Sequence, residues 1–255
     1  MFKRKNKGIG LALGGGAALG AAHIGVLKAI EEYRIPISHI SGTSIGAFVG
    51  ALYAFGKNSE ELTRIAHDMS WIQITGLTLS RLGLLKNDKL GSILSREIGD
   101  VSFKDSPVPL SMITTDISNG EKVVLNSGNV IQAMQASTCV PGVFSPVTIN
   151  NRMLVDGGIL ENVPVSPLME MGAGQIIAVD LIKKRTLAAP KNLVGILMNT
   201  FYLFLSQHPE TLLRKTDCRI QPDLGEFSVI ATKNIDKLIE AGYTAAVDKL
   251  RSFKF

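Results

Sequence analysis

The stretch SGTSIGA, residues 41–47, has Ser44 at its centre. Gly42 and Gly46 flank the serine two positions away on either side, which is the G-x-S-x-G pattern of a nucleophile elbow. In such an elbow a strand turns sharply into a helix and holds the serine at the tip. Glycine is needed at both flanking positions because side chains there would collide across the turn.

The segments around this stretch agree with an elbow. Residues Ile37–Ser41 have the character of a short strand, and Ile45–Phe55 reads as an apolar helix that Gly56 can end. A chance match on a glycine-rich turn is the alternative, but it would not require a strand before the serine and a helix after it. We therefore predict that Ser44 is a nucleophile.

A second glycine-rich stretch, GGGAALG, occupies residues 14–20. It follows a predicted buried strand at Ile9–Leu13 and precedes a predicted helix that runs to about Tyr33. Backbone N–H groups of such a loop can face an anion, and the helix N-terminus adds a favourable dipole. The dinucleotide fingerprint G-x-G-x-x-G fails at Leu19, and the Gly-Lys-Ser/Thr of a P-loop is missing. Beside a serine elbow, an oxyanion hole is the better interpretation.

The same N-terminal region imitates a targeting signal, because a basic start precedes an uncharged run from Gly8 to Leu27. That run contains seven glycines and His23. Glycine-rich backbone forms helices poorly, so a strand, loop and core helix explain the run better than a membrane span. We expect His23 to be a structural hydrogen-bonding residue and the mature protein to begin near Met1.

Composition limits the remaining possibilities. A chain of 255 residues with 45% hydrophobic content can bury one large core, so we expect a single domain over residues 1–255 with a basic tail at 1–7. The net charge of +5 is spread out, and basic and aromatic residues do not interleave as a nucleic-acid surface requires. Cys139 and Cys218 do not make a disulfide framework, which favours a cytoplasmic setting.

A short apolar strand at Met153–Asp156 ends in Asp156, Gly157 and Gly158. An aspartate at a strand end, freed by glycines, is well placed to face a site. A simple Asp-Gly turn is the alternative. Because the chain also contains the serine elbow at Ser44, we favour a role for Asp156 in a functional site.

Periodicity predicts the other elements. Trp71–Leu85 is apolar and fits either core or a lid that meets lipid, with core favoured. The stripe in Asn192–Leu205 is interpreted as core. The expected helices are Ser59–Met69, Asn87–Ile98, Asn129–Ser137, Pro164–Met171, Asn192–Leu205 and Asp236–Leu250, and the expected strands are Leu110–Ile117 and Glu121–Leu125 around an Asn119-Gly120 turn, and Gln175–Leu181.

These motifs together resemble the patatin-like phospholipases in their compact bacterial form. The matching segments are LALGGGAALGAAHIGVLKAIEE (11–32), ISGTSIGAFVGALYA (40–54), QASTCVPGVFSPV (135–147) and LVDGGILENVPV (154–165). The resemblance covers about Ile9 to Leu181 and is weak beyond. It implies a three-layer α/β/α fold with a mainly parallel sheet, and hydrolysis of acyl esters of phospholipids, lysophospholipids or related lipids.

The family's catalytic pair is a serine and an aspartate without histidine. The resemblance makes Ser44 the nucleophile and Asp156 the base, and places the oxyanion hole at Gly15, Gly16 and Ala17. The chemistry needs no metal, the sequence has no cluster of acidic residues suited to calcium, and no cofactor is expected. The motif-supporting glycines are Gly14, Gly20, Gly42, Gly46, Gly157 and Gly158.

Two positions depart from the family pattern. A glycine is usual where this chain has Ala17, and arginine or lysine is usual where it has Leu19. The missing charge keeps open a catalytically weak regulatory protein on the same fold. Acyl transfer to an alcohol is a further possibility.

An α/β-hydrolase with a Ser-Asp-His triad is the nearest alternative enzyme. Only His208 follows Asp156 in the chain and could complete such a triad. The expected partners are a lipid or acyl-ester substrate and, peripherally, the inner face of a membrane. The sequence does not specify an oligomeric state.

Overall fold

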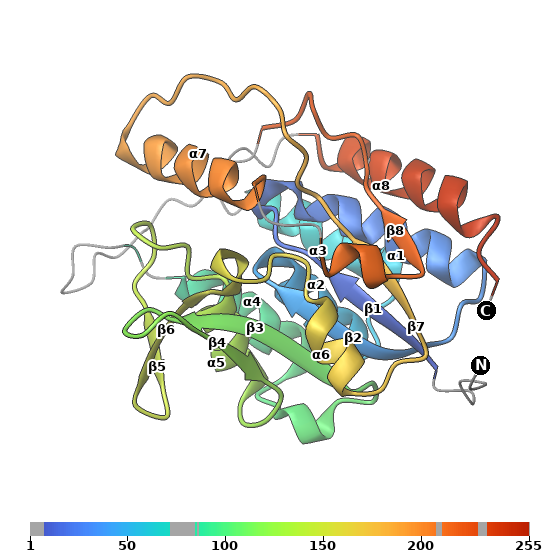
Figure 1. The fold of residues 1–255 in the computed structure, drawn as a ribbon, viewed down its shortest axis with the longest axis horizontal. Helices are drawn as coiled ribbons and strands as arrows, with labels where there is room; N and C mark the ends of the chain where they lie inside the picture. Colours follow the sequence, from blue (N-terminus) through green and yellow to red (C-terminus); the bar gives the residue numbers. More distant parts are fainter. Residues whose placement is uncertain (1–7, 72–84, 86, 208–210, 229–233, 255) are drawn as a thin grey trace.

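The computed structural model describes residues 8–71, 85, 87–207, 211–228 and 234–254, which form a mixed α/β fold (Figure 1). The strands are β1 (Ile9–Leu13), β2 (Ile37–Thr43), β3 (Leu110–Asp116), β4 (Glu121–Leu125), β5 (Val147–Ile149), β6 (Arg152–Asp156), β7 (Gln175–Val179) and β8 (Cys218–Ile220). The α-helices are α1 (Ala21–Glu32), α2 (Ile45–Ala54), α3 (Ser59–Trp71), α4 (Asp88–Ile98), α5 (Val130–Ser137), α6 (Val165–Glu170), α7 (Leu193–Leu205) and α8 (Ile235–Leu250).

The eight strands make one sheet in the order β5-β6-β3-β2-β1-β7-β8, with β4 also paired to β3. Strands β3, β2, β1, β7 and β8 are parallel to their neighbours in that order, whereas β4 and β6 run antiparallel to β3. The predicted, mainly parallel sheet is therefore confirmed. Parallel strands end at the same edge of a sheet, and in such sheets ligands bind outside the carboxyl ends.

Strand β1 is buried along its whole length between β2 and β7. Its residues Ile9, Leu11 and Leu13 belong to the large core that α1 to α5, the C-terminal end of α7 and α8 complete, and Ala12 belongs to a smaller cluster under α6. The glycine-rich N-terminal run is thus part of the fold, as expected. Helices cover both faces of the sheet, one much more heavily than the other (Figure 1).

Most predicted elements lie within two residues of the observed ones. The prediction that Asn192–Leu205 is a core helix was wrong in one respect. The helix exists as α7, and of the apolar stripe expected to be core, Leu205 is buried and Leu197, Met198 and Phe201 are half-buried, whereas Val194 is exposed; apolar side chains outside the stripe also face solvent, Leu193 being 69% exposed. The expectation for Trp71–Leu85 falls mostly outside the described residues, as does the alternative role of His208.

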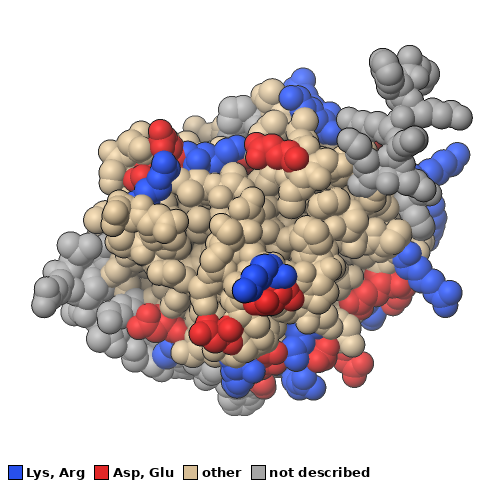
Figure 2. Space-filling view, turned by 90° about the horizontal axis from the view of Figure 1, so that it is seen from below, with Lys and Arg blue, Asp and Glu red and all other residues tan. Residues whose placement is uncertain are grey.

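None of the described helices is long and apolar enough to cross a membrane. Acidic and basic side chains are interspersed on the face seen in Figure 2, which carries no continuous basic surface in the part that the structure describes.

Candidate active site

Ser44 lies between the end of β2 and the start of α2, with φ 55° and ψ −127°. Non-glycine residues rarely adopt this left-handed region, and such strain is typical of a functional position. The flanking glycines are required by close approach. A Cβ added to Gly46 would lie 2.0 Å from the Leu13 carbonyl oxygen, and one added to Gly42 would lie 2.5 Å from Ala47 Cα. The elbow is thus packed against the end of β1.

The edge of β3 brings Asp156 to Ser44. Strand β2 pairs with β3 as far as Thr43 opposite Ile113. The next residue of β3, Thr114, pairs with Asp156 of β6. Strand β4 pairs with Met112–Asp116 on the other edge of β3, so β2 and β6 lie end to end on the remaining edge. The C-terminal ends of β2 and β6 therefore meet beside Ile113 and Thr114, which places Ser44 close to Asp156.

Asp156 is completely buried. Its Oδ1 accepts a hydrogen bond from the Gly158 N–H at 2.8 Å, and its own N–H donates to the Cys139 carbonyl at 2.9 Å. Burial raises the pKa of Asp156 to about 7, although hydrogen bonding by the Ser44 hydroxyl and the Gly158 N–H acts in the opposite direction. Oδ2 has no hydrogen-bond partner among the described residues. Such a carboxyl is suited to accept a proton near neutral pH.

The glycines after Asp156 keep this corner close to β3. A Cβ on Gly157 would lie 2.3 Å from the Ile113 carbonyl oxygen, and one on Gly158 would lie 2.9 Å from Leu205 of α7. Gly157 is therefore required by the backbone of β3, whereas a side chain at Gly158 would have to displace the end of the Leu205 side chain.

The loop after β1 presents its backbone to the same place. The Gly14 N–H donates to the Val179 carbonyl at 3.0 Å, and the Gly15 N–H donates to the Asn162 carbonyl at 3.1 Å. The N–H groups of Gly16 and Ala17 donate to no other described residue. Ala17 has φ 50°, a region that favours glycine.

Crowding also explains two other glycines of the loop. A Cβ on Gly15 would lie 3.2 Å from Ser44 Cβ, and a Cβ on Gly20 would lie 2.2 Å from Ile45 Cγ1. The loop therefore rests directly on the elbow.

His23 has the structural role expected from the sequence. Its ring is fully buried, and Nε2 lies 2.8 Å from the Gly14 carbonyl oxygen. Burial lowers the pKa of His23 to about 4, so the ring is neutral at pH 7 and Nε2–H donates to that carbonyl. Leu19, where the family usually has a cation, is buried in the large core.

Sequence reasoning missed two residues that hold the site. Ser137 Oγ accepts the Ser44 N–H at 3.0 Å and donates to the Ile113 carbonyl at 2.7 Å. Asn162 accepts the Gly15 N–H through its carbonyl, and its Nδ2 lies 3.5 Å from the Gly15 carbonyl. Both residues occur in the matching segments quoted above. Their partners, Ser44 and Gly15, lie 93 and 147 positions away in the sequence, so no local sequence pattern indicates these contacts.

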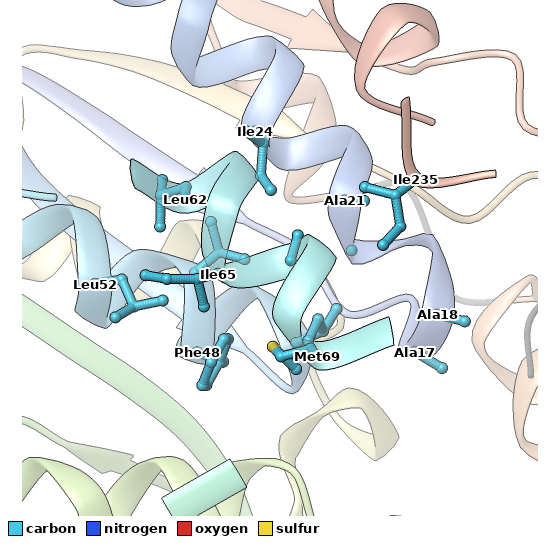
Figure 3. A pocket seen from close by; sticks show the side chains of 14 residues that line it. Ala17, Ala18, Ala21, Ile24, Phe48, Leu52, Leu62, Ile65, Met69 and Ile235 are labelled. Carbon is cyan, nitrogen blue, oxygen red and sulfur yellow. The ribbon is translucent and has the colours of Figure 1, made fainter. Parts of the chain in front are cut away.

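Two cavities adjoin these residues. One cavity is lined by Ser44, Gly16 and Ala17 and by the apolar side of α7. A second pocket lies among α1, α2 and α3 and also reaches Ala17. Figure 3 shows Ala17 and Ala18 at one side of this pocket, with Phe48, Ile65 and Met69 turned into it. Its lining consists of apolar residues and glycine only.

Comparisons with known proteins agree with this geometry. The family model for patatin-like phospholipases matches residues 11–169. The chain is 35% identical over 176 residues to an NTE family protein of Mycobacterium tuberculosis, covering 68% of this chain and 49% of that protein. It is 31% identical over 262 residues to lysophospholipase NTE1 of Eremothecium gossypii, covering 96% of this chain and 16% of that protein. The chain thus spans about half the length of the first relative and a smaller share of the second.

Among solved structures, VipD from Legionella pneumophila matches with a TM-score of 0.56 at 15% identity, covering 95% of this chain and 66% of that one. At this identity the likeness concerns the fold.

Proposed function

The chain belongs to the patatin-like phospholipase family, and we propose that it hydrolyses carboxylic esters of lipids with Ser44 as the nucleophile and Asp156 as the base. One observation carries this proposal. A serine in strained elbow geometry shares an edge of β3 with a fully buried aspartate whose pKa is raised to about 7. A serine hydroxyl is a weak nucleophile until an adjacent base takes its proton, and this carboxylate is adjacent.

The reaction follows from these positions. Asp156 accepts the hydroxyl proton while Ser44 Oγ attacks the ester carbonyl carbon. The developing oxyanion is held by the N–H groups of Gly16 and Ala17, since the Gly15 N–H is engaged by Asn162. Loss of one such donor typically costs about 3 to 4 kcal/mol of barrier. Asp156 returns the proton to the leaving alcohol, and it then activates the water that releases the acid from Ser44.

The acyl chain has a place beside this site. We assign it to the apolar pocket of Figure 3, which adjoins the oxyanion loop at Ala17 and contains no charged side chain. An alkyl chain is the ligand that such a lining favours, because burial of each methylene contributes about 0.8 kcal/mol. Phospholipids or lysophospholipids are the proposed substrate class, in keeping with the lysophospholipase named above.

Hydrolysis of a short-chain nitrophenyl ester by three variants tests the dyad. We expect Ser44→Ala to abolish turnover and Asp156→Asn to lower it by about two to four orders of magnitude. His208→Ala should stay within about threefold of the parent. Loss of activity in His208→Ala would instead favour a triad. A parent protein that hydrolyses no ester would favour the regulatory alternative.

A further inference from the structure

Helix α7 carries apolar side chains on two opposite sides. Met198, Phe201, Tyr202 and Leu205, spaced as one helical face, line the cavity at Ser44. On the other side Leu193, Ile196, Leu203 and Phe204 are between 46% and 69% exposed. Figure 1 shows α7 at the margin of the molecule.

The outer side of α7 is not ordinary surface. Nine large apolar side chains are exposed among the described residues, and five of them lie on this one helix of 13 residues. The helix has no charged residue. Single exposed apolar side chains need no explanation, whereas a contiguous group marks an interaction surface.

The charges around the helix indicate the partner. Residues 181–207 contain Lys183, Lys184, Arg185 and Lys191 and no acidic residue. Lys184 and Lys191 are exposed. An apolar helix face with basic neighbours matches a membrane surface that contains anionic lipid. A second copy of the chain fits less well, because a two-fold contact at this face would bring the same basic residues together.

We propose that the outer face of α7 docks on the surface of a bilayer containing anionic lipid. The inner face of the same helix lines the cavity at Ser44, so docking places that cavity at the source of its substrate. The benefit of docking rests on the proposed function, lipid-ester hydrolysis. The binding test itself does not require turnover.

Vesicle flotation tests the docking directly. The Ser44→Ala protein, used to prevent hydrolysis, is mixed with vesicles of phosphatidylcholine alone or with phosphatidylglycerol added. We expect co-flotation with the mixed vesicles. Adding Ile196→Glu and Leu203→Glu should reduce the bound fraction at least about tenfold, since each removes one buried aliphatic side chain from the contact. Ile117→Glu is the matched control, because Ile117 is 48% exposed, close to the 50% of Ile196, but lies after β3. That control should float like the parent.

Activity measurements separate docking from catalysis. In the otherwise native chain, Ile196→Glu and Leu203→Glu should slow hydrolysis of phospholipid vesicles at least about tenfold. The rate on a water-soluble short-chain ester should stay within about twofold. If no ester is hydrolysed, the proposed function fails while the flotation result still decides the docking. Equal flotation of parent and double variant would overturn the proposal. The proposal would also be overturned if the protein does not float with vesicles and light scattering shows that it forms a dimer which Ile196→Glu dissociates.

Discussion

The backbone N–H of Ser44 donates to Ser137 Oγ at 3.0 Å, and the Ser137 hydroxyl donates onward to the Ile113 carbonyl at 2.7 Å. This chain of two hydrogen bonds ties the strained elbow to β3, the strand that also pairs with Asp156. Ser137 therefore fixes the backbone from which the nucleophile projects, without touching substrate.

Replacing Ser137 with alanine leaves the buried Ser44 N–H without its acceptor. An unpaired buried donor costs about 1 to 3 kcal/mol, and small displacements of a nucleophile reduce turnover strongly. We expect kcat on a nitrophenyl ester to fall about tenfold or more, with KM little changed. The rate of labelling by a fluorophosphonate should fall in parallel.

Ser111→Ala is the control for that variant, because Ser111 is also buried in β3 but its hydroxyl has no partner among the described residues. It should leave kcat unchanged. A Ser137→Ala protein with native kcat would exclude the positioning role.

The raised pKa of Asp156 predicts the pH dependence of activity. A general base must be ionised, so kcat/KM should increase with pH and reach half of its plateau near pH 7. Well below that point the rate should fall about tenfold per pH unit. A pH profile with its midpoint near 4, the ordinary carboxyl range, would contradict the raised pKa of Asp156.

The same pKa predicts a stability cost at the site. Between about pH 4 and 7 the folded state keeps the Asp156 proton that the unfolded state has lost. Stability from this group therefore decreases as pH rises through that window, and the full penalty is present above pH 7. Asp156→Asn removes the ionisation and should raise the free energy of unfolding at pH 8 by on the order of 2 to 4 kcal/mol, with little gain at pH 4. Urea unfolding at both pH values measures this difference, and an equal effect at the two would contradict it.

Filling the apolar pocket should change chain-length preference. Ala66 of α3 lines the pocket, and Ala66→Phe adds a ring inside it. We expect rates on acetyl and butyryl nitrophenyl esters to stay within about threefold of the parent. The rate on the palmitoyl ester should fall about tenfold or more, because the displaced methylenes each contribute about 0.8 kcal/mol. Asp68→Phe, on the exposed side of the same helix, is the control. A uniform loss at all chain lengths in Ala66→Phe would exclude this pocket as the acyl site.

Local patterns predicted much of this molecule. The strand, elbow and helix around Ser44 were readable because glycines and apolar runs mark sharp turns and buried elements within a few residues. The buried β1 and the hairpin at Asn119-Gly120 were predicted in the same way.

What the sequence did not reveal depends on distant contacts. The pairing of Thr114 with Asp156, the bond from Ser44 to Ser137 and the engagement of Gly15 by Asn162 join segments far apart in the chain. Helix α7 shows a second limit. Periodicity identified an apolar stripe but not that one side faces a cavity and the other faces solvent, since both sides are apolar.

The most direct test of the account is the site of labelling by a fluorophosphonate, which reacts with an activated serine and needs no knowledge of the natural lipid. Intact mass and peptide mapping should find one adduct, on Ser44, which disappears in Ser44→Ala and forms much more slowly in Asp156→Asn. An adduct on another serine, or undiminished labelling of Ser44→Ala, would contradict the assignment of Ser44 as the nucleophile.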